Sequence, residues 1–126
     1  MNRLTVLSTQ QSFLDMLKLD KAIAYLLVDW SGPERASRHN IYSAFDEPGQ
    51  IEVPAFIIDC SYSVNGYVDT WLIRQREIKS DFNCGGMGET LLIEKGSIID
   101  FIKYPAQLGL ERTKEKLKEW CDKSLV

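Results

Sequence analysis

The stretch AIAYLLVDWSGPER spans residues 22–35 and joins two different local patterns. Its first seven residues form a near-continuous apolar run, which is typical of a strand covered on both faces of a sheet. Pro33 follows at an early helical position, where its missing N–H and fixed φ are harmless. Pro48-Gly49 is a stop signal for that helix. The stretch therefore predicts a buried strand that leads directly into a helix ending near Phe45.

The flanking sequence extends this pattern in both directions. A second apolar run, residues 53–60, predicts another central strand, and two such strands joined by a helix require a parallel crossover. Before the first run, residues 4–7 predict a short strand. A short helix is expected over residues 8–19, with Ser8 as N-cap and Gln11 completing a capping box.

The second half of the chain predicts a helix, a glycine-rich turn, a hairpin and a final helix. These elements are expected at residues 65–78, 83–88, 90–102 and 113–122, with the hairpin turn at Lys95-Gly96. The predicted order is βαβαβαββα. This order favours an α/β fold with a mixed central sheet between helical layers, formed by one domain over residues 1–126.

Composition narrows the classes of function. The chain has 126 residues, 44% of them hydrophobic and 26% charged, as in an average globular protein. A net charge of -3 gives no basic stripe for phosphates, so we do not expect a nucleic-acid partner. No apolar run reaches the roughly 20 residues that span a bilayer. The start of the sequence lacks a signal-peptide pattern, and we expect a cytoplasmic protein without a membrane partner.

The three cysteines are Cys60, Cys84 and Cys121, and they form neither a CxxC pair nor a zinc-ligand pattern. We therefore expect no metal site. Cys60 and Cys121 are interpreted as packing residues. Cys84 precedes two glycines in a loop, where an accessible thiol could be oxidised, glutathionylated or paired with another chain.

Three segments, in the right order and spacing, resemble the thioredoxin family along nearly the whole chain. Residues 30–35, Trp-Ser-Gly-Pro-Glu-Arg, resemble that family's Trp-Cys-Gly-Pro-Cys-Lys/Arg. Residues 90–99, TLLIEKGSII, are similar to its hairpin, and residues 113–120, TKEKLKEW, to its closing helix. The resemblance implies a thioredoxin-like fold with three α/β/α layers.

The resemblance does not extend to the residues that carry the family's chemistry. Ser31 and Glu34 replace the two cysteines, and a serine hydroxyl cannot form a disulfide. Tyr25 aligns with the family's buried acid. Glu89 aligns with its cis-proline, and because a cis bond before a non-proline residue costs about 2.5–4 kcal/mol, we expect a trans bond there. Dithiol–disulfide exchange is therefore not expected.

The leading hypothesis is a redox-inactive protein-binding or scaffold module without a cofactor. Its binding residues would lie around the former active site, which includes Trp30, Ser31, Gly32, Pro33, Glu34, Met87 and Glu89. Trp30 and Met87 either form an exposed apolar patch or fold inward. In the more ordinary interpretation, Ser31 is a helix N-cap, Glu34 pairs with Arg38, and His39 lies on the helix surface.

Two alternatives come from other functional classes. In the first, Ser31 stabilises a bound glutathione thiolate, or Cys84 supports single-cysteine oxidoreductase or transferase chemistry. In the second, the chain is a structural subunit, monomeric or homodimeric, with Trp71 or Trp120 in the interface.

Overall fold

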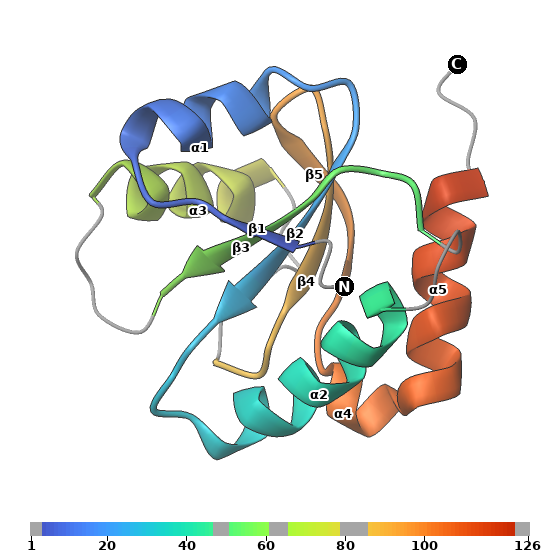
Figure 1. The fold of residues 1–126 in the computed structure, drawn as a ribbon. Coiled ribbons are helices and arrows are strands. Elements are labelled where there is room, and N and C mark those ends of the chain that lie inside the picture. The colour runs from blue at the N-terminus through green and yellow to red at the C-terminus, as the bar shows by residue number, and fades with distance from the viewer. Residues whose placement is uncertain (1–3, 47–50, 61–65, 79–85, 123–126) are drawn as a thin grey trace.

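Strand β2 lies in the middle of a five-stranded sheet with the order β1-β3-β2-β4-β5 (Figure 1). The structure is a computed structural model, and it describes residues 4–46, 51–60, 66–78 and 86–122. The elements along the chain are β1 (Leu4–Val6), α1 (Gln10–Leu17), β2 (Ala22–Leu27), α2 (Gly32–Asp46), β3 (Ala55–Asp59), α3 (Gly66–Ile78), β4 (Thr90–Glu94), β5 (Ser97–Ile102), α4 (Pro105–Leu108) and α5 (Leu110–Asp122).

The sheet is mixed, as the sequence predicts. β2 pairs in parallel with β3, and β3 in parallel with β1. On its other side β2 pairs antiparallel with β4, which forms the predicted hairpin with β5. Tyr25 lies opposite Thr90, so the carboxyl end of β2 is next to the amino end of β4. The loops that follow β2 and precede β4 are thereby brought together.

Both faces of β2 are buried, which explains its unbroken apolar sequence. Ile23 and Tyr25 belong to a core shared with α2 and α5, whereas Ala24 and Leu26 belong to a core shared with α1 and α3. Side chains alternate between the faces of a strand, so a central strand needs apolar residues at every position. Figure 1 shows the resulting three layers, with α1 and α3 on one face of the sheet and α2, α4 and α5 on the other.

The tryptophans Trp71 and Trp120 are part of these cores. Trp71 lies on α3 and packs in the core that α1 and α3 share with the sheet. Its indole N–H donates to the carbonyl oxygen of Gly96 at 2.9 Å. Trp120 is fully buried, and its indole N–H donates to Asp100 Oδ2 at 2.9 Å. Both tryptophans are packed within their own chain, so their placement gives no support to a role in a homodimer interface, and the oligomeric state stays a prediction.

Two further expectations need correction. Helix α1 is capped by Thr9, whose side chain accepts from the backbone N–H of Ser12 at 3.1 Å, so the predicted Ser8–Gln11 capping box is displaced by one residue. The final helix starts at Leu110 rather than Thr113, and the short helix α4 precedes it. Pro105 at the first turn of α4 and Gly109 just after it, with a φ of 93°, are the local signals for α4.

Backbone geometry agrees with the expectation at Glu89. No peptide bond is cis in the described part of the chain, so the bond before Glu89 is trans. Among the described helices, none combines the length and the apolar character needed to cross a bilayer.

Candidate functional site

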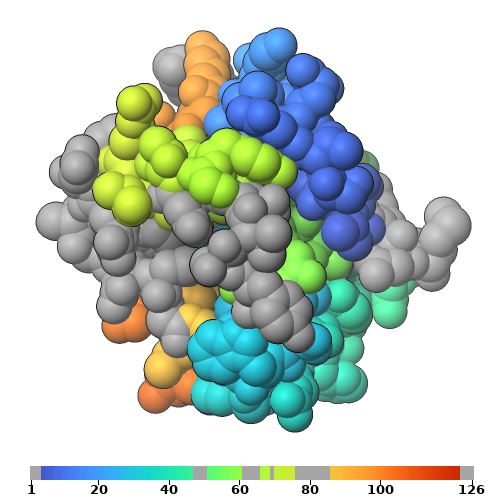
Figure 2. Space-filling view, turned by 90° about the vertical axis from the view of Figure 1, so that its left-hand side faces the viewer, coloured from blue at the N-terminus to red at the C-terminus, as the bar shows by residue number. Residues whose placement is uncertain are grey.

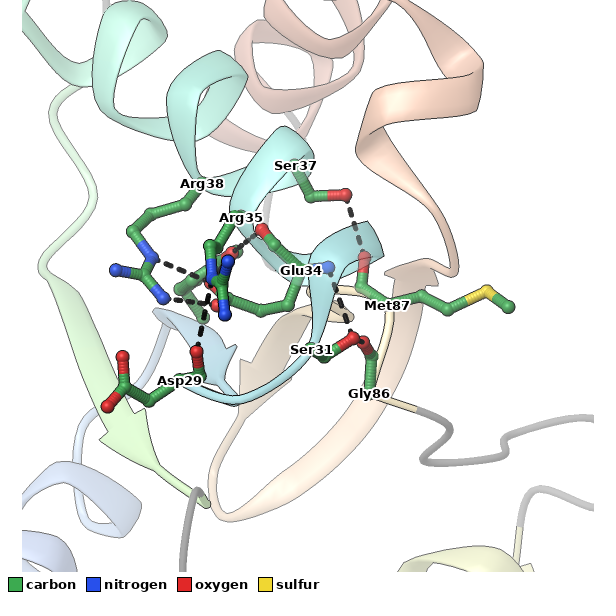
Figure 3. Close-up of polar contacts among 9 residues, drawn as sticks. Asp29, Ser31, Glu34, Arg35, Ser37, Arg38, Gly86 and Met87 are labelled. Carbon is green, nitrogen blue, oxygen red and sulfur yellow. Dashed lines mark hydrogen bonds and ion pairs between the residues drawn. The ribbon is translucent and has the colours of Figure 1, made fainter.

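The candidate site forms where the start of α2 meets the loop of residues 86–89 (Figure 3). The backbone N–H of Leu26 donates to the carbonyl oxygen of Glu89 at 2.9 Å, which fixes this loop beside the end of β2. The site therefore depends on the antiparallel pairing of β2 with β4, and residues about fifty positions apart in sequence are neighbours in it.

Ser31 binds both parts of the site. Its hydroxyl donates to the carbonyl oxygen of Gly86 at 2.6 Å and accepts from the backbone N–H of Glu34 at 3.4 Å. The second contact is that of an N-cap serine with the third residue of its helix, as predicted. Ser31 is also buried, so its hydroxyl is engaged within the protein rather than presented to a ligand.

Glu34 lies at the centre of a polar cluster that we call the Glu34 cluster, formed by the buried side chains of Tyr25 and Glu34 and the half-buried side chain of Arg38. Glu34 is 0% exposed. The Tyr25 hydroxyl donates to Glu34 Oε2, and Arg38 binds the same carboxylate through two nitrogens, with Nε at 2.9 Å from Oε2. The predicted pairing of Glu34 with Arg38 is thus confirmed.

The charges of the Glu34 cluster depend on one another. Burial, followed by the hydrogen bond to Glu34, raises the pKa of Tyr25, so the phenol stays protonated and donates. The hydrogen bond with Glu34 raises the pKa of Arg38, so the guanidinium keeps its charge. A buried carboxylate without a partner would be strongly destabilising, whereas this one has a charged partner and a hydroxyl donor. The cluster therefore makes a charged group tolerable at this buried position.

Gly88 allows the loop to approach α2 closely. Its φ is +80°, and a methyl group there would lie 2.6 Å from Cβ of Ser37 and 2.9 Å from the Tyr25 hydroxyl oxygen. Beside it, the Ser37 hydroxyl donates to the carbonyl oxygen of Met87 at 2.7 Å and accepts from the backbone N–H of Ala106 at 3.1 Å. The loop, α2 and α4 are thereby held as one unit.

Glu89 is also buried, at 1% exposure. Its carboxylate oxygen Oε1 accepts from the backbone N–H of Met87 at 3.2 Å. The side chain of Glu89 therefore folds back onto its own loop.

The exposed part of the site consists of Trp30, Gly32, Pro33 and Met87, which we call the rim. Trp30 is 66% exposed, Gly32 and Pro33 are exposed, and Met87 is half-buried. A methyl group on Gly86 would lie 3.8 Å from the Trp30 ring, so this indole lies beside the loop. Figure 3 shows the Met87 side chain pointing away from the Glu34 cluster. In Figure 2, the cyan atoms of the segment that leads into α2 form the lower part of the face.

The remaining predicted residues lie outside this arrangement. His39 is exposed on α2, as expected, and Cys60 and Cys121 are partly buried against the two cores. Cys84 lies outside the described residues. Within the described ranges, no group of three or more His, Cys, Asp or Glu residues is arranged to hold a metal ion.

The sequence alone does not predict the contact between Tyr25 and Glu34, nor the part played by Ser37. One signal was present: Tyr25 and Glu34 align with the family's buried acid and its resolving cysteine. Both side chains differ from those usual in the family, and this paired difference could have suggested that Tyr25 and Glu34 contact each other.

Comparison with solved structures identifies the fold. Thioredoxin Mala s 13 from Malassezia sympodialis is 14% identical with a TM-score of 0.65, covering 96% of this chain and 93% of that chain. Thioredoxin NaTrxh from Nicotiana alata is 12% identical with a TM-score of 0.61, covering 96% and 95%. A mutant thioredoxin from Halobacterium salinarum is 14% identical with a TM-score of 0.58, covering 96% and 93%.

No protein-family model matches the sequence, and no curated protein matches it either. The likeness to the three solved thioredoxins shows that the chain has the thioredoxin fold. At sequence identities of 12–14%, this likeness extends to the fold alone. What the site does must be argued from its own residues.

Proposed function

We propose that this chain is a redox-inactive thioredoxin-like protein that binds another protein through the rim. The observation that carries the proposal is the exposure of Trp30. The neighbouring side chains of Ser31 and Glu34 are buried and hydrogen-bonded within the protein. Tryptophan is enriched among the few residues that dominate the binding energy of protein interfaces.

The buried residues of the site support this surface. Ser31 holds the loop through Gly86, and the Glu34 cluster fills the position beneath the first turn of α2. A surface that is already ordered loses less conformational entropy on binding. In this proposal Ser31, Glu34 and Glu89 position the rim, and Trp30 and Met87 contact the partner.

The alternative based on glutathione has less support. It requires the Ser31 hydroxyl to face a ligand thiolate, whereas that hydroxyl donates to the Gly86 carbonyl and is buried. Single-cysteine chemistry at Cys84 stays a prediction, because Cys84 is outside the described residues.

The test is quantitative capture from a lysate of cells that express the protein, followed by binding measurements with the purified partner. Wild type is compared with Trp30→Ala and with the matched control Ile73→Ala, which removes another exposed apolar side chain, on α3. We expect a partner that binds wild type and Ile73→Ala equally and Trp30→Ala at least tenfold more weakly, a loss typical of a central aromatic contact. Equal binding by all three proteins, or no specific partner, would contradict the proposal.

A further inference from the structure

An open groove of about 860 Å³ lies between the end of β5, helix α4 and helix α5, with Met87 among its lining residues. Its volume is within the range of ordinary ligand sites, roughly 300–1,000 Å³. The lining residues are Met87, Phe101, Ile102, Lys103, Tyr104, Gln107, Leu108, Arg112 and Lys116.

The groove has an apolar base and a positive edge. Apolar or aromatic side chains supply five of its lining residues, and three others are cationic, with no carboxylate among them. Lys116 is neutralised by Asp100, whose Oδ2 lies 2.9 Å from its Nζ. The side chains of Lys103 and Arg112 are exposed and form no ion pair with any residue in the described ranges. These two charges therefore face solvent at the groove, in a chain of net charge -3.

Hydrogen bonds to α2 and α5 fix helix α4, which forms one wall of the groove. Asn40 Nδ2 donates to the carbonyl oxygen of Pro105 at 3.2 Å, and the hydroxyl of Thr113 donates to the same oxygen at 3.3 Å. The Ala106 N–H donates to Ser37 Oγ. α4 is thereby held between α2 and α5, so the groove is formed before any ligand arrives.

We propose that this groove binds an acidic segment of a partner protein in which carboxylates flank an apolar side chain. The apolar side chain would lie on the base near Leu108, and the carboxylates would face Lys103 and Arg112. Met87 lines the groove and also belongs to the rim, so one extended segment can contact both surfaces. In that respect the inference rests on the proposed function and names the chemistry of its partner.

The test uses fluorescein-labelled peptides and the full chain, with binding followed by fluorescence anisotropy. The peptides are Glu-Glu-Phe-Glu-Glu and its counterpart Lys-Lys-Phe-Lys-Lys. We expect the acidic peptide to bind and the basic one not to bind. Raising the salt from about 0.02 M to about 0.15 M should weaken acidic binding, because exposed charges are screened over about 8 Å at the higher concentration.

Arg112→Glu and Lys118→Glu provide a matched pair of charge reversals on α5. Lys118 lies on a different hollow of that helix, next to Glu115, Glu119 and Asp122. We expect Arg112→Glu to weaken binding of the acidic peptide about tenfold and Lys118→Glu to weaken it less than about twofold, since position relative to the groove decides the effect.

Four outcomes would overturn the inference. They are no binding of the acidic peptide, equal binding of both peptides, equal losses in the two variants, and displacement of the peptide by 3-phenylpropanoate at equal concentration. The last outcome would assign the groove to small aromatic carboxylates instead. The proposed function of the rim can fail independently of the groove. In that case the Trp30→Ala variant would still bind the cellular partner, and the acidic peptide would still bind in the groove.

Discussion

The hydroxyl of Tyr25 on β2 donates a hydrogen bond to the carboxylate of Glu34 on α2, with both side chains fully buried. In the thioredoxin family the corresponding positions are those of a buried acid and the resolving cysteine. The acidic group here is on the helix rather than on the strand, and Arg38 compensates its charge. The two side chains fit each other, and together with Arg38 they join the end of β2 to the first turn of α2.

Removing the cation of the Glu34 cluster should destabilise the protein. In Arg38→Met, the carboxylate of Glu34 would stay buried without its charged partner, and we expect a loss of about 3 kcal/mol in the free energy of unfolding. The measurement is urea denaturation at neutral pH. Arg35→Met is the control, because Arg35 is exposed on the same helix, and it should cost less than about 0.5 kcal/mol. Equal effects of the two substitutions would contradict this account of Arg38.

The coupling between Tyr25 and Glu34 can be measured with a double-mutant cycle. Tyr25→Phe removes the hydroxyl but keeps the ring, and we expect it to cost about 2 kcal/mol because a hydrogen bond to a charged acceptor is lost. In a Glu34→Gln background the same substitution should cost about 1 kcal/mol less, since the acceptor is then neutral. Strict additivity in thermal or urea unfolding would show that the two side chains are not energetically coupled.

Gly88 should tolerate no side chain. Gly88→Ala places a methyl group 2.6 Å from Cβ of Ser37, in a backbone conformation with a φ of +80° that alanine rarely adopts. We expect a loss of at least about 2 kcal/mol, from strain and overpacking together. Gly32→Ala is the matched control. A methyl group at Gly32 meets no atom within 4 Å at the first position of α2, so that variant should be neutral or slightly stabilised.

Asp100 should make stability dependent on pH in the acid range. Burial would raise the pKa of its carboxyl group, but the hydrogen bonds from Lys116, Trp120 and the backbone of Phe101 together lower it below its ordinary value. A lowered pKa in the folded state means that the ionised carboxylate stabilises the protein above about pH 4 and that this stabilisation is lost as the pH falls.

The test for Asp100 is the difference in unfolding free energy between wild type and Asp100→Asn, measured from pH 7 down to pH 3. Wild type should be more stable at pH 7, and the difference should shrink below about pH 4. Asp20→Asn, at an exposed site, should change stability by less than about 0.5 kcal/mol at pH 7. A difference between wild type and Asp100→Asn that is constant over the range would contradict the assignment.

The sequence predicted the fold where local pattern determines structure. The apolar run of β2 and the turn at Lys95-Gly96 each constrain one element, and the i,i+4 spacing of Glu34 and Arg38 was enough to predict their pairing. Helix α4 was missed because four residues carry almost no periodic signal. Its position depends on hydrogen bonds that it forms with Ser37 and Asn40, which are more than sixty residues away.

The exposure of Trp30 was also left open by the sequence. Whether an indole at the start of a helix turns inward depends on the space left by neighbouring segments, and that space is set by packing. Here Gly86, Ser31 and Val28 lie close together beside the indole, and the indole itself is 66% exposed.

This placement gives the protein a built-in optical reporter. Trp71 and Trp120 are buried, and only Trp30, at 66% exposure, lies largely in water. Collisional quenchers such as acrylamide or iodide should therefore act mainly on the emission of Trp30. Binding of a partner next to Trp30 should shift the emission of this tryptophan to shorter wavelength and reduce its quenching, and no label is needed to measure either. The emission of the buried Trp71 and Trp120 should instead report on unfolding.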